Sequence, residues 1–338
     1  MKGKNKKIVT FGEVLMRLSP SGNRKMSQTD HLDFFFGGTE MNVGASLCYF
    51  GESVQHITAV SDDLIGDAAK MAMKGYGLDI TAVQQVPHPI GQYLLEVGSG
   101  MRSSRIAYNR LHGSFANIDP ALIDWQHAFE NAGHFHWTGI TPAISESTYQ
   151  ALKDGLKLAR ERGLSITADP AYRSNLWNYG REGKQVLREL VEMSTIFIGG
   201  VNEINEILGT DYGYDQKDFV AAAKNLMTQC PSITKVFDKV RTGLSASWQK
   251  ISGQAWTGDR LLTTNELEIT QVVDRIGTGD AFAGGLIYGL IYYNDQKALE
   301  FANAACALKH TILGDVNLVS TEDVLEVVDG NTGGRIKR

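Results

Sequence analysis

Short apolar runs alternate with stretches of helical pattern along most of the chain. The runs cover residues 8–11, 55–60, 134–138, 165–168, 195–198 and 235–237, each short enough for one buried strand. Helical patterns cover residues 67–74, 147–162, 278–292 and 301–310, and Gly163 follows the second of them at the C-cap position. Buried strands that alternate with helices are typical of a parallel sheet covered by helices. The pattern therefore predicts an α/β fold.

Two segments, residues 15–36 and 91–111, break this alternation, because apolar and polar residues alternate there without an intervening helix. In the second segment, residues 93–97 and 105–108 flank a polar turn that contains Gly98 and Gly100, which predicts a β-hairpin. We expect these segments to form a small β lid on a single domain spanning residues 1–330. Residues 331–338 are expected to form a disordered tail.

Composition and charge narrow the range of partners. The 338 residues include 33 basic and 38 acidic side chains, a net charge of −5, which argues against a nucleic-acid partner. The one basic cluster, Lys2, Lys4, Lys6 and Lys7, is interpreted as a solvated tail. The first apolar run is too short for a signal peptide, and the longest, residues 281–293, falls short of the roughly 20 residues of a membrane span. Three scattered cysteines, Cys48, Cys230 and Cys306, predict reduced thiols and a cytoplasmic protein.

The segment 274–285 is the most informative for chemistry. Gly277 and Gly279 permit tight turns and close approach to a ligand at the start of the predicted helix 278–292. The free N–H groups and the dipole of a helix N-terminus favour an anion such as phosphate. Asp280 lies in that first turn, where a carboxylate could accept the proton of an attacking hydroxyl. Capping of the helix by Asp280 is the alternative interpretation.

Other phosphate-binding motifs are missing from the sequence. There is no G-x4-G-K-[ST] loop and no H-R-D or D-F-G set. Neither the residues after the first strand nor the late glycine loop, with Phe282 at the third glycine position, match a dinucleotide fingerprint. A second segment, residues 37–47, places Gly37 and Gly38 before a helix start. That pair could serve a ligand or the close packing of a helix on the sheet.

Together the two segments resemble the ribokinase-like (PfkB) carbohydrate kinases. Residues 37–44 follow the family signature G-G-x-x-x-N-x-A except at Gly44, and residues 274–280 follow D-x-x-G-A-G-D with Thr278 at the alanine position. The resemblance extends from Ile8 to Val328. It implies a ribokinase-like three-layer α/β/α fold with a central, mostly parallel sheet, and transfer of the ATP γ-phosphate to a sugar hydroxyl with Mg²⁺. In that comparison Asp280 is the catalytic base, and Gly277, Thr278 and Gly279 form the anion hole.

Further residues look like the 2-keto-3-deoxygluconate kinase branch of that family, which phosphorylates the 6-hydroxyl of a sugar acid. The resemblance assigns substrate binding to Gly37, Gly38, Asn42, Tyr93, Tyr108, Arg110, Arg173 and Asp280. Arginine suits a carboxylate because it offers paired planar donors, and tyrosine can pack on a sugar and still form hydrogen bonds. The alternative for the two arginines is a surface ion pair.

Two family motifs are altered. The N-x-x-E motif, which positions the magnesium shell, aligns Glu203 with the glutamate but puts Gly200 at the asparagine; the register that restores Asn202 puts Asn205 at the glutamate. We favour Glu203, acting through water. The usual glycine-rich nucleotide segment is replaced by residues 235–241. Nucleotide contacts are therefore expected from Gly277, Gly279, Lys239 and Asn303.

Several features receive simpler interpretations. His134 and His136 share a strand face but lack a third metal ligand, so packing or hydrogen bonding is expected. Tyr288, Tyr292 and Tyr293 are expected in the core or at a subunit contact of a homo-oligomer. The leading hypothesis is a sugar-acid kinase that uses ATP and Mg²⁺ and binds neither nucleic acid nor membrane. A neutral-sugar kinase and a non-catalytic sugar- or nucleotide-binding regulator are the alternatives.

Overall fold

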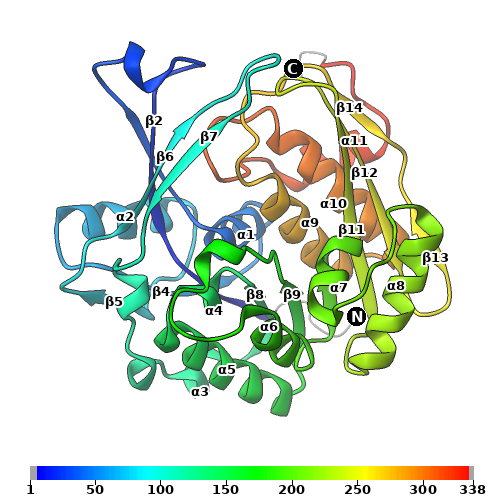
Figure 1. Cartoon of the computed structure of the whole chain (residues 1–338), viewed down its shortest axis with the longest axis horizontal. Helices are drawn as coiled ribbons and strands as arrows, with labels where there is room; N and C mark the ends of the chain where they lie inside the picture. The colour runs from blue at the N-terminus through cyan, green and yellow to red at the C-terminus, as the bar shows by residue number, and fades with distance from the viewer. Residues whose placement is uncertain (1–5, 335–338) are drawn as a thin grey trace.

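The computed structural model describes residues 6–334, whose largest element is a ten-stranded sheet (Figure 1). The strand order is β13-β12-β11-β10-β9-β8-β1-β4-β5, with β14 also paired to β12. Neighbouring strands from β11 through β10, β9, β8, β1 and β4 to β5 are parallel to one another. Strand β12 pairs antiparallel with β11, β13 and β14. The bounds are β1 Lys7–Phe11, β4 Val54–Ser61, β5 Val83–Val86, β8 Ala132–Thr138, β9 Ser165–Asp169, β10 Ile196–Ile198, β11 Lys235–Gly243, β12 Gln249–Trp256, β13 Leu261–Thr263 and β14 Leu267–Ile269.

Helices cover both faces of this sheet, which gives the three layers expected. Their bounds are α1 Thr39–Tyr49, α2 Leu64–Gly75, α3 Trp125–Ala128, α4 Thr141–Ile144, α5 Glu146–Glu161, α6 Gly183–Val191, α7 Val201–Leu208, α8 Gln216–Gln229, α9 Thr278–Tyr292, α10 Asp295–Lys309 and α11 Thr321–Val328. Successive strand residues point to opposite faces. Val9 therefore packs in the core with α3 to α8, while its neighbour Ile8 packs with α1, α2, α9 and α10.

A separate four-stranded sheet stands at one side of the body (Figure 1). Its order is β3 (Asp33–Gly37), β2 (Leu15–Ser19), β6 (Gly91–Glu96) and β7 (Arg105–Asn109). The predicted hairpin is β6 and β7, and the parallel pairing of β2 with β6 joins the two inserted segments. We call these four strands the lid sheet. Short 3-10 turns span Met26–Gln28, Phe115–Asn117, Pro120–Leu122 and Ser174–Leu176.

The predicted elements are present, with some boundaries shifted. Helix α2 begins at Leu64 because Asp63 accepts hydrogen bonds from the backbone N–H groups of Ile65 and Gly66. Helix α10 begins at Asp295, well before residue 301, with Asn294 as its N-cap. The antiparallel strands β12 to β14 were not predicted, because they lack the alternation with helices that identified the others.

The N-terminal prediction was wrong for one lysine. Lys7 begins β1, and its Nζ donates to Oε1 of Gln55 at 3.0 Å, so it belongs to the sheet and not to a tail. Lys6 is exposed, whereas Lys2 and Lys4 lie outside the described residues. The predicted tail is described only over residues 331–334, which form neither helix nor strand, and residues 335–338 lie outside the description.

The hydrogen bonding expected of the two histidines is confirmed, and Tyr288 and Tyr293 pack against a core cluster, as one of the two interpretations of the tyrosines predicted. His134 Nε2 and His136 Nδ1 lie 2.9 and 2.8 Å from the hydroxyl of Thr167, and burial lowers the pKa of both imidazoles to about 3. Tyr288 packs on Phe301 with ring centroids 5.0 Å apart, in a core cluster beside α11. The three cysteines are unpaired. None of the helices in residues 6–334 has the length and apolar character needed to cross a bilayer.

Candidate active site

The N-terminus of α9 is shaped by its own loop. Gly277 is the N-cap with φ 77°, a left-handed conformation, and a Cβ there would overlap the carbonyl oxygen of Asp315. Only glycine fits both conditions. Asp274 Oδ1 accepts the backbone N–H of Ile276 at 3.0 Å, and the Thr278 hydroxyl donates to the Arg275 carbonyl at 3.1 Å. The loop thus leads into the first turn of a helix, whose N–H groups have no partners within the helix and suit an anion.

Asp280 lies at the start of α9 and contacts the segment of residues 37–47, which begins with Gly37 and Gly38. Asn42 of α1 donates from Nδ2 to Oδ2 of Asp280 at 2.7 Å, and the Gly38 N–H donates to Oδ1 of Asn42 at 3.3 Å. Two segments 238 residues apart therefore share one site. Burial raises the pKa of Asp280 to about 7, although the hydrogen bond from Asn42 opposes the rise. The carboxyl group can therefore gain or lose a proton near neutral pH.

Lys239 of β11 supplies a positive charge beside this helix start. Its Nζ lies 3.4 Å from the position of a Cβ on Gly279, and it favours the charged form of Asp280. Apart from the helix's own backbone, a Cβ at Gly279 would meet no other described atom within 4 Å. The space in front of Gly279 is therefore open and faces one ammonium group. That combination of amides and ammonium fits a phosphate.

Three further carboxylates lie close together. Asp169 and Asp238 are near Lys239, and Glu203 of α7 is near both of these acids. Burial raises the pKa of Asp169 to about 7, and Glu203 adds to the rise. Asp238 accepts from Nε2 of Gln254 at 2.8 Å, yet burial and Glu203 raise its pKa to about 6. Ligands of open α/β sheets bind outside the carboxyl ends of the strands. These acids therefore lie where a substrate is expected.

Packing explains why glycine stands at position 200, where the family's N-x-x-E motif has asparagine. A Cβ there would lie 2.7 Å from Oδ2 of Asp238, so the Asp238 carboxylate fills the space that a side chain at position 200 would need. Glu203 Oε2 accepts the Gly200 N–H at 2.9 Å. The negative charges of Asp238 and Glu203 repel each other, and a divalent cation bound between them would relieve that repulsion.

The donor set around Gly200 fits magnesium. Mg²⁺ takes oxygen ligands and is usually held by one or two carboxylates, several waters and substrate phosphates. Glu203 and Asp238 are such carboxylates. In the described part of the chain, no three or more His, Cys, Asp or Glu side chains are arranged to hold a metal by themselves.

The two glycines at the start of α1 are required by packing. A Cβ at Gly38 would overlap the Glu13 carbonyl oxygen, and one at Gly37 would overlap the carboxylate of Asp315. Close packing therefore explains the pair. The backbone N–H of Gly38 still belongs to the site through its bond to Asn42.

The lid sheet brings three predicted sugar-binding residues together. Tyr93 is buried and donates its hydroxyl to Asp315, while its ring centroid lies 5.8 Å from that of Tyr108, whose side chain is exposed. Arg110, only 7% exposed, donates to Glu13 and lies over the Tyr108 ring. Arg110 therefore forms an ion pair, but a buried one and not the surface pair of the alternative interpretation, and its contact with a sugar stays a prediction. Within residues 6–334, Glu13 Oε1 and Arg110 Nε have no hydrogen-bond partner.

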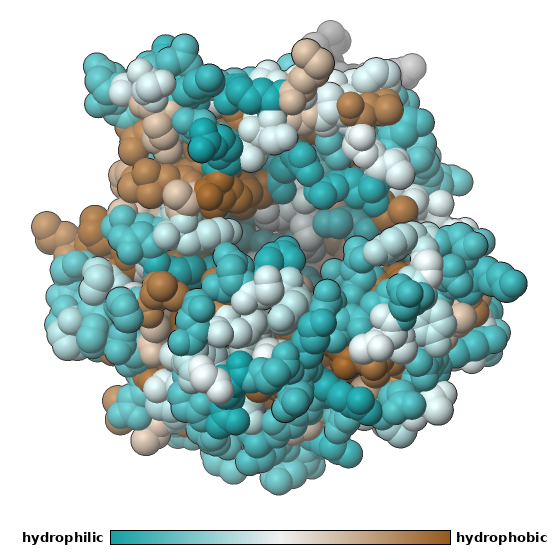
Figure 2. All heavy atoms as spheres, in the orientation of Figure 1, coloured by the Kyte–Doolittle hydropathy of each residue, from teal (hydrophilic) through white to brown (hydrophobic). Residues whose placement is uncertain are grey.

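The other two predicted contacts are placed differently. Arg173 is exposed after β9, donates to the Tyr172 carbonyl at 3.0 Å, and is near enough to Asp169 to stabilise its charge. Asn303 is buried on α10 and donates to the Asn265 carbonyl at 3.3 Å. Figure 2 shows the face of the molecule hollowed between the lid sheet and the body, with hydrophobic residues gathered on the lid side.

Sequence reasoning missed several buried charges. Glu40 of α1 accepts from the N–H and hydroxyl of Thr138 at 3.0 and 2.8 Å and from the Thr141 hydroxyl at 2.7 Å, which ties α1 to the sheet. Arg17, Lys309 and Asp315 are also buried. A charged residue inside an apolar strand, as in Leu-Met-Arg-Leu-Ser at residues 15–19, was the available signal for Arg17.

Comparisons with known proteins agree with this geometry. Residues 5–321 match the model of the pfkB family carbohydrate kinases. A 2-dehydro-3-deoxygalactonokinase from Haloferax volcanii is 27% identical over 330 residues, covering 97% of this chain and 98% of that protein. A 2-dehydro-3-deoxygluconokinase from Bacillus subtilis is 26% identical over 324 residues, covering 94% and 93%. The crystal structure of a 2-dehydro-3-deoxygluconokinase from Thermotoga maritima is 32% identical with a TM-score of 0.92, covering 96% of this chain and 100% of that one. The chain therefore belongs to the pfkB family of carbohydrate kinases and has the ribokinase-like fold expected from its sequence.

Proposed function

We propose that this carbohydrate kinase transfers the γ-phosphate of ATP to the 6-hydroxyl of 2-keto-3-deoxygluconate, with Asp280 as the general base. The observation that carries the proposal is the Asp280 carboxylate at the start of α9, held by Asn42 at 2.7 Å. A general base is most effective when its pKa lies near the working pH. Burial gives Asp280 a pKa of about 7, which meets this condition.

The neighbouring residues have complementary roles. Phosphoryl transfer depends mainly on positioning and on stabilisation of charge that spreads over the phosphoryl oxygens. The amides of Gly277, Thr278 and Gly279 face that charge, and Lys239 adds a cation beside Gly279. Mg²⁺, when bound, would neutralise phosphate charge, and Glu203 and Asp238 are the residues that would hold it through water.

The nucleotide base is expected beyond Lys239, toward α10. Asn303 is buried there, and its Oδ1 has no hydrogen-bond partner among residues 6–334. Its amide donates to Asn265 in the connection between β13 and β14. Contact between Asn303 and the nucleotide stays a prediction, supported by this spare acceptor.

The names of the relatives support a sugar acid as substrate. Arg173 is the stronger candidate for its carboxylate, because no described anionic side chain lies within ion-pair distance of the Arg173 guanidinium, whereas Arg110 already meets Glu13. The Glu13 and Arg110 pair still offers one acceptor and one donor, which suit sugar hydroxyls. Tyr93 already donates its hydroxyl proton to Asp315, so it can offer a sugar its ring face and its hydroxyl oxygen as an acceptor.

A neutral sugar is the second candidate, and the same pair favours it. Glu13 neutralises Arg110, so the lid side of the site carries less positive charge than the two arginines alone suggest. A kinase of a neutral ketose would need no unpaired cation there. The choice between the substrates therefore depends on Arg173.

The test is a coupled ADP-release assay over sugar acids and neutral ketoses, with the product's phosphate position read by NMR. We expect phosphorylation of 2-keto-3-deoxygluconate at its 6-hydroxyl. Arg173→Ala should lower the ratio of kcat/KM for this acid over a neutral ketose by about 10- to 160-fold, since an arginine–carboxylate contact contributes roughly 1.5–3 kcal/mol. Arg181→Ala, which removes an exposed arginine paired with Glu146, is the matched control and should leave the ratio unchanged.

Each alternative has its own result in this assay. An unchanged ratio in Arg173→Ala, together with efficient turnover of a neutral ketose, would favour the neutral-sugar kinase. Binding of sugar and ATP without ADP release for any acceptor would favour the regulator. Homo-oligomeric assembly and a cytoplasmic location, both expected from the sequence, stay predictions.

A further inference from the structure

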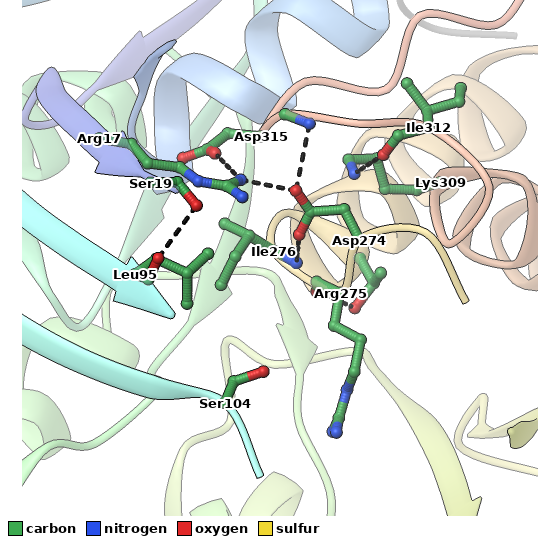
Figure 3. Close-up of polar contacts among 12 residues, drawn as sticks. Arg17, Ser19, Leu95, Ser104, Asp274, Arg275, Ile276, Lys309, Ile312 and Asp315 are labelled. Atoms are coloured by element: carbon green, nitrogen blue, oxygen red, sulfur yellow. Dashed lines mark hydrogen bonds and ion pairs between the residues drawn. The ribbon is translucent and has the colours of Figure 1, made fainter. Parts of the chain in front are cut away.

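A second group of charges lies behind the anion hole, buried and not used by the proposed chemistry (Figure 3). We call Arg17, Asp274, Lys309 and Asp315 the buried charge cluster. Arg17 of β2 is fully buried, and its Nη1 lies 2.6 Å from Oδ2 of Asp274 and 2.9 Å from Oδ1 of Asp315. Lys309 donates from Nζ to the Ile312 carbonyl at 2.9 Å. Buried charges persist only when they are paired, and here two cations balance two anions.

Asp315 is the point at which the lid sheet meets the anion hole. Its side chain accepts from Arg17 of β2 and from the hydroxyl of Tyr93 of β6, and it lies against Gly37 at the end of β3. Its backbone carbonyl oxygen lies against Gly277, filling the space where a Cβ would be. One residue therefore contacts three lid strands and the first glycine of the phosphate-binding loop.

Asp274, the second carboxylate bound by Arg17, connects to the backbone on both sides of the anion hole. Its Oδ1 accepts the Ile276 N–H at 3.0 Å, and its Oδ2 accepts the Gly314 N–H at 3.1 Å (Figure 3). Arg17 thus joins the segment before α9 to the segment after α10. These two segments enclose Gly277, so a shift of Arg17 has to move the backbone that frames the anion hole.

Among the described residues, the hydrogen bonds of the Arg17 side chain all come from Nη1. Its Nε and Nη2 have no hydrogen-bond partner within residues 6–334, and its guanidinium lies 5.1 Å from the centre of the Phe35 ring on β3. Both carboxylates accept from the single atom Nη1. The position of β2 therefore determines whether one nitrogen can reach both acids.

From these contacts we propose that Arg17 is a positioning residue that couples the lid sheet to the anion hole, so that lid closure over the sugar improves phosphate binding. The inference rests on the proposed function, because it takes the sugar to lie under the lid. Without Arg17, Asp274 and Asp315 would face each other with one buried ammonium. The Gly314 N–H would still join Asp274 to the segment after α10, but β2 of the lid sheet would lose its ion pairs to both segments. Closure of the lid would then no longer change the position of the backbone at Gly277.

Calorimetry tests the coupling directly. The affinity of a non-hydrolysable ATP analogue with Mg²⁺ is measured with and without saturating 2-keto-3-deoxygluconate. Coupling between two sites typically changes affinity about 5- to 150-fold. We expect the sugar to tighten analogue binding at least about 5-fold in the wild type, and the factor to approach one in Arg17→Met while each ligand alone still binds. Arg17→Lys should restore part of the factor, because it keeps the charge but not the planar group.

Two controls separate coupling from general destabilisation. Leu226→Ala removes a buried side chain of α8, remote from the lid, and should lower the melting temperature yet keep the wild-type coupling factor. Tyr93→Phe removes only the hydroxyl contact to Asp315, so it should reduce the factor without unfolding the chain, even if Arg17→Met does not fold. A wild-type factor in Arg17→Met or Tyr93→Phe, or no coupling in a wild type that binds both ligands, would overturn the inference.

Hydrogen exchange keeps this test separate from the test of the proposed function. If the wild type does not bind the sugar acid, the proposed function fails, and the coupling is read without substrate. Arg17→Lys should then speed exchange at the amides of residues 276–280 and 93–96 together, relative to Leu226→Ala. Exchange confined to the lid would refute a connection through Arg17.

Discussion

Replacement of Asp280 by asparagine tests the chemistry and the energetics of the site together. The amide keeps the size of the side chain, and its oxygen can still accept from Asn42, so sugar binding should be retained. An amide does not accept the proton of the attacking hydroxyl. General bases contribute roughly 10²- to 10⁴-fold to rate, and kcat of Asp280→Asn should fall by about that factor.

The pKa of Asp280 sets two pH dependences. The base must be ionised to act, so wild-type kcat/KM should rise as pH increases through about 7. Stability should change in the opposite direction. The pKa is raised on folding from 3.8 to about 7, so the folded state binds the proton more tightly, and stability present below pH 4 is lost as pH rises through about 7.

The rise in the pKa of Asp280 sets an upper bound on the change in the free energy of unfolding with pH. At 1.36 kcal/mol for each tenfold change in acid dissociation, a rise from 3.8 to about 7 corresponds to about 4 kcal/mol. Asp280→Asn, which carries no charge, should therefore be more stable than wild type at pH 8, by as much as this bound, and nearly equal to it at pH 4. The same substitution should thus stabilise the protein and inactivate it.

Urea unfolding at pH 4 and pH 8 and the ADP-release assay across pH 6 to 8 measure both effects. Asp218→Asn is the matched control, since Asp218 also lies in the first turn of a helix, α8, away from the site. It should change neither kcat nor the pH profile. Turnover of Asp280→Asn within a few-fold of wild type, or a variant less stable than wild type at pH 8, would refute the assignment of a buried base.

Three further outcomes follow from the same geometry. Gly279→Val should abolish phosphoryl transfer, because its side chain would enter the open space before Lys239. Sugar binding should stay measurable, because the loop backbone is unstrained at this position, and normal ATP turnover would exclude phosphate from this space. Lys239→Met should raise KM for ATP and move the pH profile to higher pH, since Lys239 favours the charged form of Asp280; titration at an unchanged pH would contradict their proximity. The sugar acid should slow hydrogen exchange across β6 and β7, and equal exchange with and without saturating sugar would argue against lid closure.

Local sequence determined the elements and the centre of the site. The alternation of short apolar runs with helical patterns predicted the parallel strands other than β5, because burial on both faces demands continuous apolar runs. Strand β5 was missed because its sequence, Val-Gln-Gln-Val, is half polar. Gly277 could be recognised from sequence since its conformation is local. Asp280 and Asn42 could be assigned because each lies at a fixed offset from glycines that the chain needs for tight approach.

The tertiary structure alone decided which charges meet. Arg110 pairs with Glu13 and Arg17 with Asp274 and Asp315 across 97, 257 and 298 residues, and no local pattern encodes such distances. Asp238 fills the space beside Gly200 only because β11 lies next to β10 in the sheet. The pKa of a carboxyl group depends on its burial and neighbouring charges, which arise when distant segments pack together. Sequence therefore predicted Asp280 as the base, whereas packing set the proton affinity of its carboxyl group.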